Sequence, residues 1–281
     1  MIQSETLLAR MQALTREEPC DGGSPLPTLS EEHLSALSRE TGQGMRELQV
    51  LALRHGITPA RYLRNFRELT SGDQERLLSS RAGLAGLGGL GGHLLESLVR
   101  MGVGTIMVAD GDRFEESNLN RQLLSERDTL GMAKTEAARR RAAAVNPAVE
   151  IQAMSLTLDR QGLRTFFRGA DVLFDGLGGV AVKKLLLECA RDLGIPVISA
   201  AAAGWSCIVT TVLPGQSAPP DLFGSAGGAE LSLGCLAPAI AVAAAVQCSE
   251  GVRLLCGRKP ALAGKLLAVD LSRGSFEVFE L

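Results

Sequence analysis

A cluster of glycines could bring the backbone close to a phosphate group. Four of them precede a predicted helix over residues 93–99: Gly86, Gly88, Gly89 and Gly91. Glycine lets the chain turn tightly and approach a phosphate, which then meets the N-terminal end of the helix. Such loops are common, but Asp110 ends a predicted strand about 20 residues later, where a dinucleotide fold places the acid that binds a ribose hydroxyl. The spacing therefore predicts a nucleotide site.

A second run of residues, downstream of that strand, is more specific because it could stabilise charge during nucleotidyl transfer. Arg121 and Lys134 could neutralise phosphate charge as it shifts towards a leaving pyrophosphate. Asp112 could help to place a metal ion, Asn118 could donate to a phosphate, and Gln122 belongs to the same nucleotide-binding string. A dehydrogenase has no need of this set, although each residue alone could be an ordinary solvated surface group.

The cysteines do not form a recognisable metal or redox motif, because no two of the six are spaced as C-x-x-C. We expect them to be small core residues and expect no structural zinc. Cys207 and Cys235 are candidates to accept an activated group by their location alone. Cys235 is the better candidate because it precedes a predicted helix, and helix N-termini favour thiolates. We still prefer the interpretation that both thiols are unreactive.

Composition narrows the class of protein. The 281 residues are 46% hydrophobic and 21% charged, which is typical of a soluble globular chain. A net charge of -2 and 4% aromatic residues argue against a nucleic-acid partner. The early acidic residues do not fit a signal peptide, and the longest apolar run, 236–246, is interrupted by Pro238 and too short to span a bilayer. We therefore expect a cytoplasmic protein with no membrane partner.

Short apolar strands alternate with helices from about residue 81 onward. The predicted strands cover 81–85, 105–109, 149–153, 171–174 and 196–200, and helices cover 133–145 and 180–193. Later strands at 207–213, 265–269 and 275–279, with a helix over 236–255 among them, extend the sheet. This order predicts an α/β, Rossmann-like, doubly wound, mainly parallel sheet with antiparallel C-terminal strands.

The first 70 residues form a separate, small helical region in this interpretation, and residues 71–281 form the nucleotide-binding domain. Residues 20–27 are a predicted loop, Ser30 caps a helix, and a second helix covers 45–55. The two helices around a glycine-containing turn would also suit a DNA-binding helix-turn-helix, but they lack a basic face.

Taken together, these motifs resemble the ThiF/MoeB/HesA family, which is related to the ubiquitin-activating enzymes. The resemblance runs from about residue 61 to 281 and includes Asn146-Pro147, Gly204-Trp205 and the closing helix over 244–257. It implies adenylation, with ATP and Mg²⁺, of the C-terminal Gly-Gly carboxylate of a small ubiquitin-like sulfur carrier protein. It also implies a homodimer.

The resemblance assigns roles by position. The glycines of the loop would line the phosphates, Asp110 would hold the ribose, and Asn118, Arg121 and Lys134 would contact the triphosphate. Arg64 resembles the arginine that the family inserts into the active site of the neighbouring subunit.

One departure affects the metal site. Where the family has Asp, two residues and then Asp-Asn, this chain has Asp175 followed by Gly178 and Gly179. The change removes a hard oxygen ligand next to a divalent cation. Either Asp112 or Asp175 compensates as a Mg²⁺ ligand, or adenylation is slow or absent. A nucleotide-binding protein without adenylation activity is thus an alternative, and an NAD-dependent oxidoreductase is a weaker one because it gives Arg121 and Lys134 no role.

Overall fold

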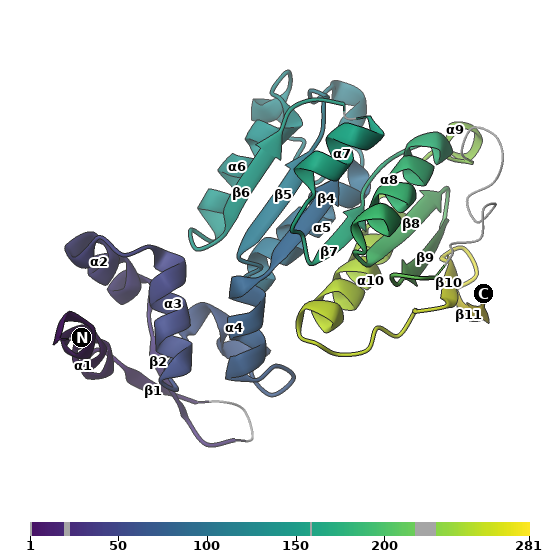
Figure 1. Cartoon of the computed structure of the whole chain (residues 1–281). Helices are drawn as coiled ribbons and strands as arrows, with labels where there is room; N and C mark the ends of the chain where they lie inside the picture. Colours follow the sequence, from purple (N-terminus) through teal and green to yellow (C-terminus); the bar gives the residue numbers. More distant parts are fainter. Residues whose placement is uncertain (1, 20–22, 158, 217–228) are drawn as a thin grey trace.

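The computed structural model describes residues 2–19, 23–157, 159–216 and 229–281. Figure 1 shows a small N-terminal region at one end of an α/β domain that is built on one large sheet. The C-terminal strands lie at the opposite end of that sheet from the N-terminal region.

The N-terminal region contains more strand than its sequence predicts. Its elements are α1 (Ile2–Ala13), β1 (Arg16–Glu18), β2 (Leu26–Leu29), α2 (Glu31–Thr41), α3 (Met45–Arg54), β3 (Thr58–Pro59) and the 3-10 helix η1 (Ala60–Asn65). The predicted cap is confirmed, since the Ser30 side chain accepts from the backbone N–H of His33. The three short strands pair in the order β1-β2-β3 within the described residues. They were missed because β1 is charged and β2 contains Pro27, which are poor strand signals.

Helix α4 (Ser71–Ser79) joins this region to the sheet. Thr70 caps α4 by accepting from the backbone N–H of Asp73, at the boundary that the sequence suggests. Buried Tyr62 ties the two parts together: its hydroxyl donates to Gln49 (3.2 Å) and accepts from Asn146 (2.9 Å). The division of the chain near residue 70 remains a prediction.

The described residues form an eight-stranded sheet of the predicted kind, with the order β11-β10-β9-β8-β7-β4-β5-β6. Its strands are β4 (Arg81–Ala85), β5 (Thr105–Ala109), β6 (Glu150–Met154), β7 (Val172–Asp175), β8 (Val197–Ala203), β9 (Ser206–Val212), β10 (Lys265–Asp270) and β11 (Ser275–Glu280). Strands β4 to β8 pair in parallel, and β9, β10 and β11 pair antiparallel. The strand order reverses between β4 and β7, where such folds bind ligands.

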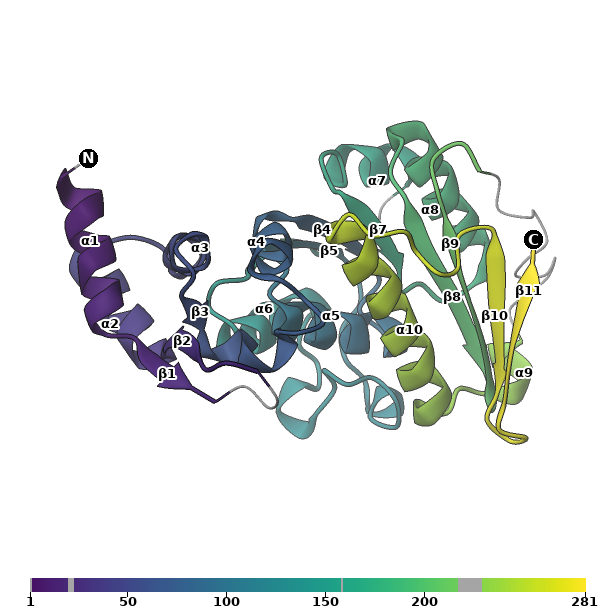
Figure 2. The same ribbon diagram turned by 90° about the horizontal axis from the view of Figure 1, so that it is seen from below.

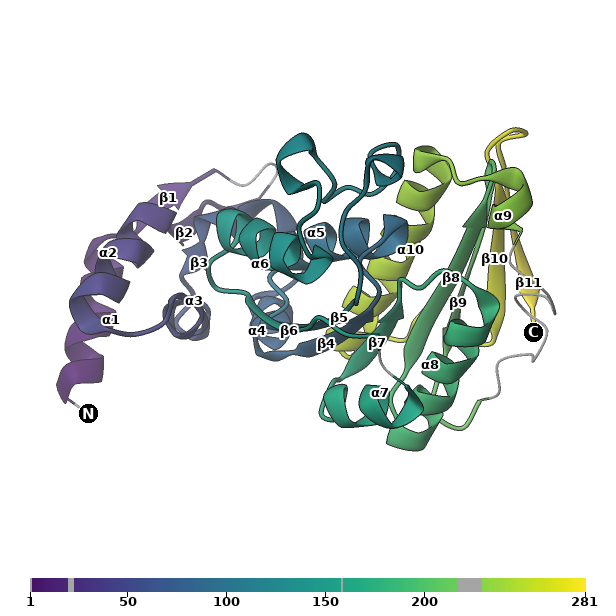
Figure 3. The ribbon, with the colours of Figure 1, turned by 90° about the horizontal axis from the view of Figure 1, so that it is seen from above.

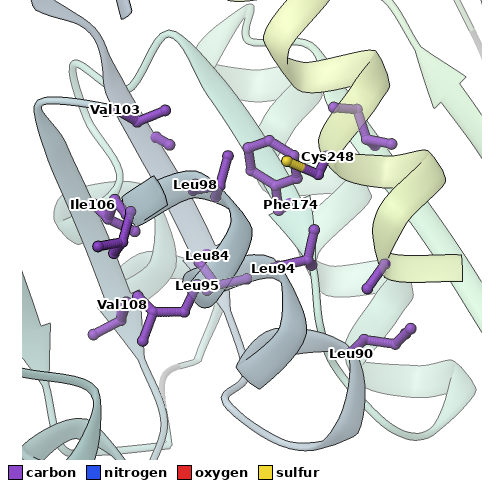
Figure 4. Close-up of a cluster of buried hydrophobic side chains, with 14 of the residues drawn as sticks. Leu84, Leu90, Leu94, Leu95, Leu98, Val103, Ile106, Val108, Phe174 and Cys248 are labelled. Atoms are coloured by element: carbon purple, nitrogen blue, oxygen red, sulfur yellow. The ribbon is translucent and has the colours of Figure 1, made fainter. Parts of the chain in front are cut away.

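Helices cover both faces of the sheet. Figures 2 and 3 show α5 (Gly89–Met101), α6 (Lys134–Val145) and α10 (Ala237–Leu255) on one face, and α7 (Arg160–Phe166) and α8 (Val180–Leu193) on the other. Short connections contain η2 (Glu116–Asn118), η3 (Arg127–Thr129) and α9 (Glu230–Leu233). In Figure 4, leucines of α5 pack against Ile106, Val108 and Phe174 of the sheet and Cys248 of α10.

One detail of this core, at Pro238, differs from the sequence expectation, and another, at Gly83, explains an unusual strand. Pro238 does not interrupt the apolar run, because it lies in the first turn of α10, where its missing N–H is tolerated. That helix is long and apolar enough to cross a membrane by length and composition alone, but half of the stretch is buried within the protein. Strand β4 lacks β-branched residues partly because Gly83 must stay small: a Cβ there would lie 2.4 Å from a methyl of Leu173.

Candidate functional site

A cavity of about 430 Å³ lies at the carboxyl ends of the central parallel strands. Residues that end or follow β4, β5, β7 and β8 line it, so it spans the point where the strand order reverses. The lining includes most of the predicted site residues: Gly86, Gly88, Gly89, Asp110, Asp112, Arg121, Gln122 and Lys134. The structure thus brings the glycine loop and the downstream charged string together.

The glycine loop is held by backbone contacts that exclude larger residues. Gly86 has φ of 87°, and a Cβ on it would lie 2.6 Å from the carbonyl oxygen of Gly176. A Cβ on Gly91 would lie only 1.9 Å from the carbonyl oxygen of Gly86. Helix α5 starts here with Gly88 at its N-cap position and no side-chain cap. Its first backbone N–H groups are therefore suited to an anion such as a phosphate.

Asp110 organises the loop from the end of β5. One carboxylate oxygen accepts from the backbone N–H of Leu87 (2.7 Å) and the other from that of Asp112 (2.8 Å). The carboxylate is half-buried at the cavity wall, where it could also accept from a ribose hydroxyl.

Lys134 is positioned by a short antiparallel pairing of the chain. Its backbone N–H donates to the carbonyl of Asp112 (3.0 Å), and that of Phe114 donates to the carbonyl of Met132 (3.0 Å). The Lys134 ammonium then reaches the Asp112 carboxylate at 3.0 Å and lies 5.9 Å from the ring centre of Phe114. Lys134 is buried, whereas the Asp112 side chain is 72% exposed.

Arg121 and Gln122 follow η2 and also line the cavity. Arg121 donates to the carbonyl of Ser117 (3.0 Å) and the side-chain oxygen of Asn120 (2.7 Å), which holds its guanidinium at the cavity. Gln122 is 7% exposed, and its side-chain oxygen has no hydrogen-bond partner among the described residues. A buried amide oxygen without a partner at a cavity wall indicates a position suited to a polar ligand.

Four predicted site residues do not line the cavity. Gly91 lies within α5 against Gly86, and its role is to let the helix approach the loop. Asn118 is buried and caps η2, where its side-chain oxygen accepts from the backbone N–H of Glu115 (3.1 Å). Arg64 is exposed near the end of η1, outside the lining of its own chain. Asp175 is 1% exposed and lies behind the wall. Direct contacts from these residues to a nucleotide remain predictions.

Lys183, which the sequence analysis does not identify, lines the cavity in the first turns of α8. Its ammonium contacts the Asp175 carboxylate (2.9 Å) and donates to the carbonyl of Ala200 (2.7 Å). A lysine inside a predicted helix gives no sign that it lies at a buried position. The one hint of its pairing with Asp175 is that Lys183 follows Asp175 by eight residues. Helix α8 packs against the strand that Asp175 ends, so a residue early in α8 can reach that carboxylate.

The donor groups fit a nucleotide better than they fit a two-carboxylate metal site. The uncapped helix and three cations suit phosphates, and Asp112 could hold Mg²⁺ next to them. Asp175 is engaged within the protein, because it accepts from Lys183, from Ser199 and from the backbone N–H of Leu177. Within the described ranges, no group of three or more His, Cys, Asp or Glu residues could hold a metal ion.

The cysteines differ sharply in their surroundings. Cys235 is half-buried and lines the cavity, next to Asn120, whose side chain donates to its carbonyl (3.4 Å). Cys207 is buried in β9, and burial raises the pKa of its thiol to about 11. Burial likewise raises the pKa of Cys248 to about 12. Cys20 lies outside the described residues.

Comparison with known proteins gives a consistent picture. The sequence model of the ThiF family matches residues 60–281. The SAMP-activating enzyme E1 of Haloferax volcanii is 30% identical over 209 residues, which cover 73% of this chain and 77% of that protein. The molybdopterin-synthase adenylyltransferase of Escherichia coli is 31% identical over 214 residues, covering 74% and 86%. The sulfur carrier protein ThiS adenylyltransferase of Bacillus subtilis is 30% identical over 200 residues, covering 69% and 60%.

Solved structures show the same fold. The crystal structure of E. coli MccB with ATP superposes with a TM-score of 0.70 and 19% identity, covering 89% of this chain and 79% of that chain. The crystal structure of PaaA has a TM-score of 0.64 and 23% identity, covering 84% and 72%. At these identities, the likeness is one of fold alone.

Proposed function

The chain belongs to the ThiF family, and on that premise we propose that it is an adenylyltransferase for a small protein. In the proposed reaction, ATP activates the C-terminal carboxylate of a ubiquitin-like sulfur carrier that ends in Gly-Gly. One carboxylate oxygen bonds to the α-phosphorus, the bond from that phosphorus to the bridging oxygen breaks, and pyrophosphate leaves with the electron pair. The product is an acyl-adenylate.

One observation carries the proposal: the glycine loop, Arg121 and Lys134 line the same cavity. Backbone N–H groups at the start of α5 would bind phosphate oxygens, and the two cations would offset the charge that develops on pyrophosphate. Asp110 would fix the ribose and thereby the direction of the nucleotide. Catalysis in this scheme is positioning and charge stabilisation, with Mg²⁺ beside Asp112 supplying further charge when it is bound.

A homodimer is part of the proposal. Arg64 is exposed and outside the lining of its own cavity, which suits a residue that reaches the site of a second copy. Mixing Arg64→Ala with Lys134→Ala protein should then restore activity, because a mixed dimer contains one site with both residues intact. Equal inactivity of the mixture and of each variant alone would contradict this arrangement.

Carrier-dependent exchange of labelled pyrophosphate into ATP tests the function directly. Lys134→Ala should lower the exchange rate by about 100-fold, the effect of losing one preorganised charge contact to the transition state. The matched control is Lys184→Ala, because Lys184 is exposed on α8 and lies outside the cavity lining. An unchanged, robust rate for Lys134→Ala would refute the site assignment.

A second candidate, nucleotide binding without adenylation, is favoured by Gly178. This residue lines the cavity, and no carboxylate occupies its position. A Cβ at Gly178 would meet nothing within 4 Å, so Gly178→Asp should be accommodated. Negligible exchange by the wild type together with ATP binding, and a large gain from Gly178→Asp, would establish the second candidate.

A further inference from the structure

We propose that Lys183 is a third phosphate-binding cation of the cavity and that Asp175 is its positioning residue rather than a metal ligand. The inference rests on the proposed use of ATP. It concerns the reaction centre itself, because Lys183 and Arg121 line one cavity with the glycine loop.

A metal ion could bind Asp175 only by breaking the hydrogen bonds that its carboxylate accepts within the protein. One carboxylate oxygen accepts from Lys183 (2.9 Å) and from the Ser199 hydroxyl, and the other accepts from the backbone N–H of Leu177 (3.0 Å). The carboxylate is 1% exposed and does not line the cavity. Mg²⁺ requires near-octahedral oxygen ligands, so it would have to displace Lys183 and enter the protein interior.

The two members of the ion pair lie at different depths relative to the cavity. Lys183 is 4% exposed and belongs to the lining, whereas Asp175 does not, so the cation is the member of the pair nearer to a bound ligand. The additional bond from Lys183 to the carbonyl of Ala200 (2.7 Å) fixes the ammonium at the end of β8. A fixed dipole of this kind stabilises negative charge without reorganisation during the reaction.

The ligand at this position should be the phosphate chain held by the glycine loop. The loop after β7 and the glycine loop are in backbone contact, since a Cβ on Gly86 would lie 2.6 Å from the carbonyl oxygen of Gly176. Lys183 follows that loop in the first turns of α8. Phosphate oxygens bound at the glycine loop therefore lie beside the loop after β7. A cation at Lys183 would then explain how the site keeps a nucleotide pocket although Gly178 supplies no carboxylate.

The test is ATP affinity, measured by isothermal titration calorimetry in EDTA and again with excess Mg²⁺. Lys183→Met should weaken ATP binding by about 10-fold or more under both conditions, as expected for one lost bond to a charged group. Lys184→Met, which alters the exposed neighbouring lysine, should stay within about two-fold of the wild type. The ratio of the two affinities, which measures the advantage that Mg²⁺ confers, should not change in Lys183→Met.

Either single change leaves one buried charge without its ion-pair partner, the carboxylate in Lys183→Met and the ammonium in Asp175→Asn, and could unfold the protein. The double variant Asp175→Asn/Lys183→Met removes both charges and avoids that problem. It should keep the Mg²⁺ advantage of the wild type. A general structural defect would lower both ATP affinities and leave their ratio unchanged, so the ratio reports on metal binding.

Two results would overturn the inference while leaving the proposed function intact. They are wild-type ATP affinity in Lys183→Met, or a Mg²⁺ advantage that disappears in the double variant, which would make Asp175 a metal ligand. Failure of the wild-type protein to bind ATP would instead remove the proposed function and this inference together.

Discussion

Replacing Gly91 by alanine should weaken nucleotide binding by about two orders of magnitude without removing any polar group. The new Cβ would start 1.9 Å from the carbonyl oxygen of Gly86, whereas real Cβ contacts stay beyond 3.0 Å. The loop and the start of α5 must therefore separate by about 1 Å. A misplacement of about 1 Å can lower a catalysed rate about 100-fold where exact geometry is needed, and we expect a loss of similar size in ATP affinity.

Gly92→Ala is the matched control, since Gly92 is the next residue of the same helix. Its Cβ would lie 3.4 Å from the backbone nitrogen of Leu123, which is an ordinary contact. Alanine there should raise the free energy of unfolding by about 0.5–1 kcal/mol, because glycine is unfavourable inside a helix. Its dissociation constant for ATP should stay within about three-fold of the wild type.

Calorimetric titration with ATP, with the melting temperature and circular dichroism measured in parallel, separates the two effects. We expect Gly91→Ala to keep the α/β spectrum and lose about two orders of magnitude in ATP affinity. Wild-type affinity in Gly91→Ala, or an equal loss in Gly92→Ala, would show that the phosphate does not bind at this loop.

The remaining predictions concern Cys235, Gln122 and Tyr62. In a Cys20→Ser background, iodoacetamide should modify Cys235 first, and ATP should slow this reaction at least about five-fold. If ATP does not affect the labelling, the nucleotide binds elsewhere. Gln122→Met should weaken ATP binding several-fold without destabilising the free protein, because the side-chain oxygen it removes has no partner within the described ranges; clear destabilisation in a melting experiment would contradict this. Burial raises the pKa of Tyr62 to about 12, so the unfolded chain ionises first and stability should fall between pH 10 and 12 by up to about 2.7 kcal/mol. Denaturant titrations should show a smaller fall for Tyr62→Phe, and an identical pH dependence would refute the assignment.

Much of the sheet could be predicted because its strands are short apolar runs between glycine-rich or polar turns. Residues 81–85, 105–109 and 180–193 match β4, β5 and α8, and most other boundaries shift by one to three residues. Helix α5 begins four residues before the helix that the sequence predicts. The glycine loop and Lys134 could be predicted for a different reason. Their positions follow from local features, a helix N-terminus and a short chain pairing, that sequence spacing records.

The parts that escaped prediction depend on long-range packing. Asp175 looks like a metal ligand in the sequence because it ends a strand at the sheet edge where ligands bind, but its partners Lys183 and Ser199 come from α8 and β8. The strands of the N-terminal region form only through pairing between segments that are weak strand formers. Apart from the eight-residue separation between Asp175 and Lys183, neither arrangement has a local pattern that spacing could reveal.

The transfer of oxygen from carrier to nucleotide tests the central claim most directly. A Gly-Gly carrier with ¹⁸O in its C-terminal carboxylate would be incubated with ATP, the protein and hydroxylamine, which traps an acyl-adenylate as a hydroxamate and releases AMP. Attack of the carboxylate on the α-phosphorus predicts AMP that carries one ¹⁸O, together with pyrophosphate. Unlabelled AMP, or formation of ADP and phosphate instead, would contradict adenylation at this cavity.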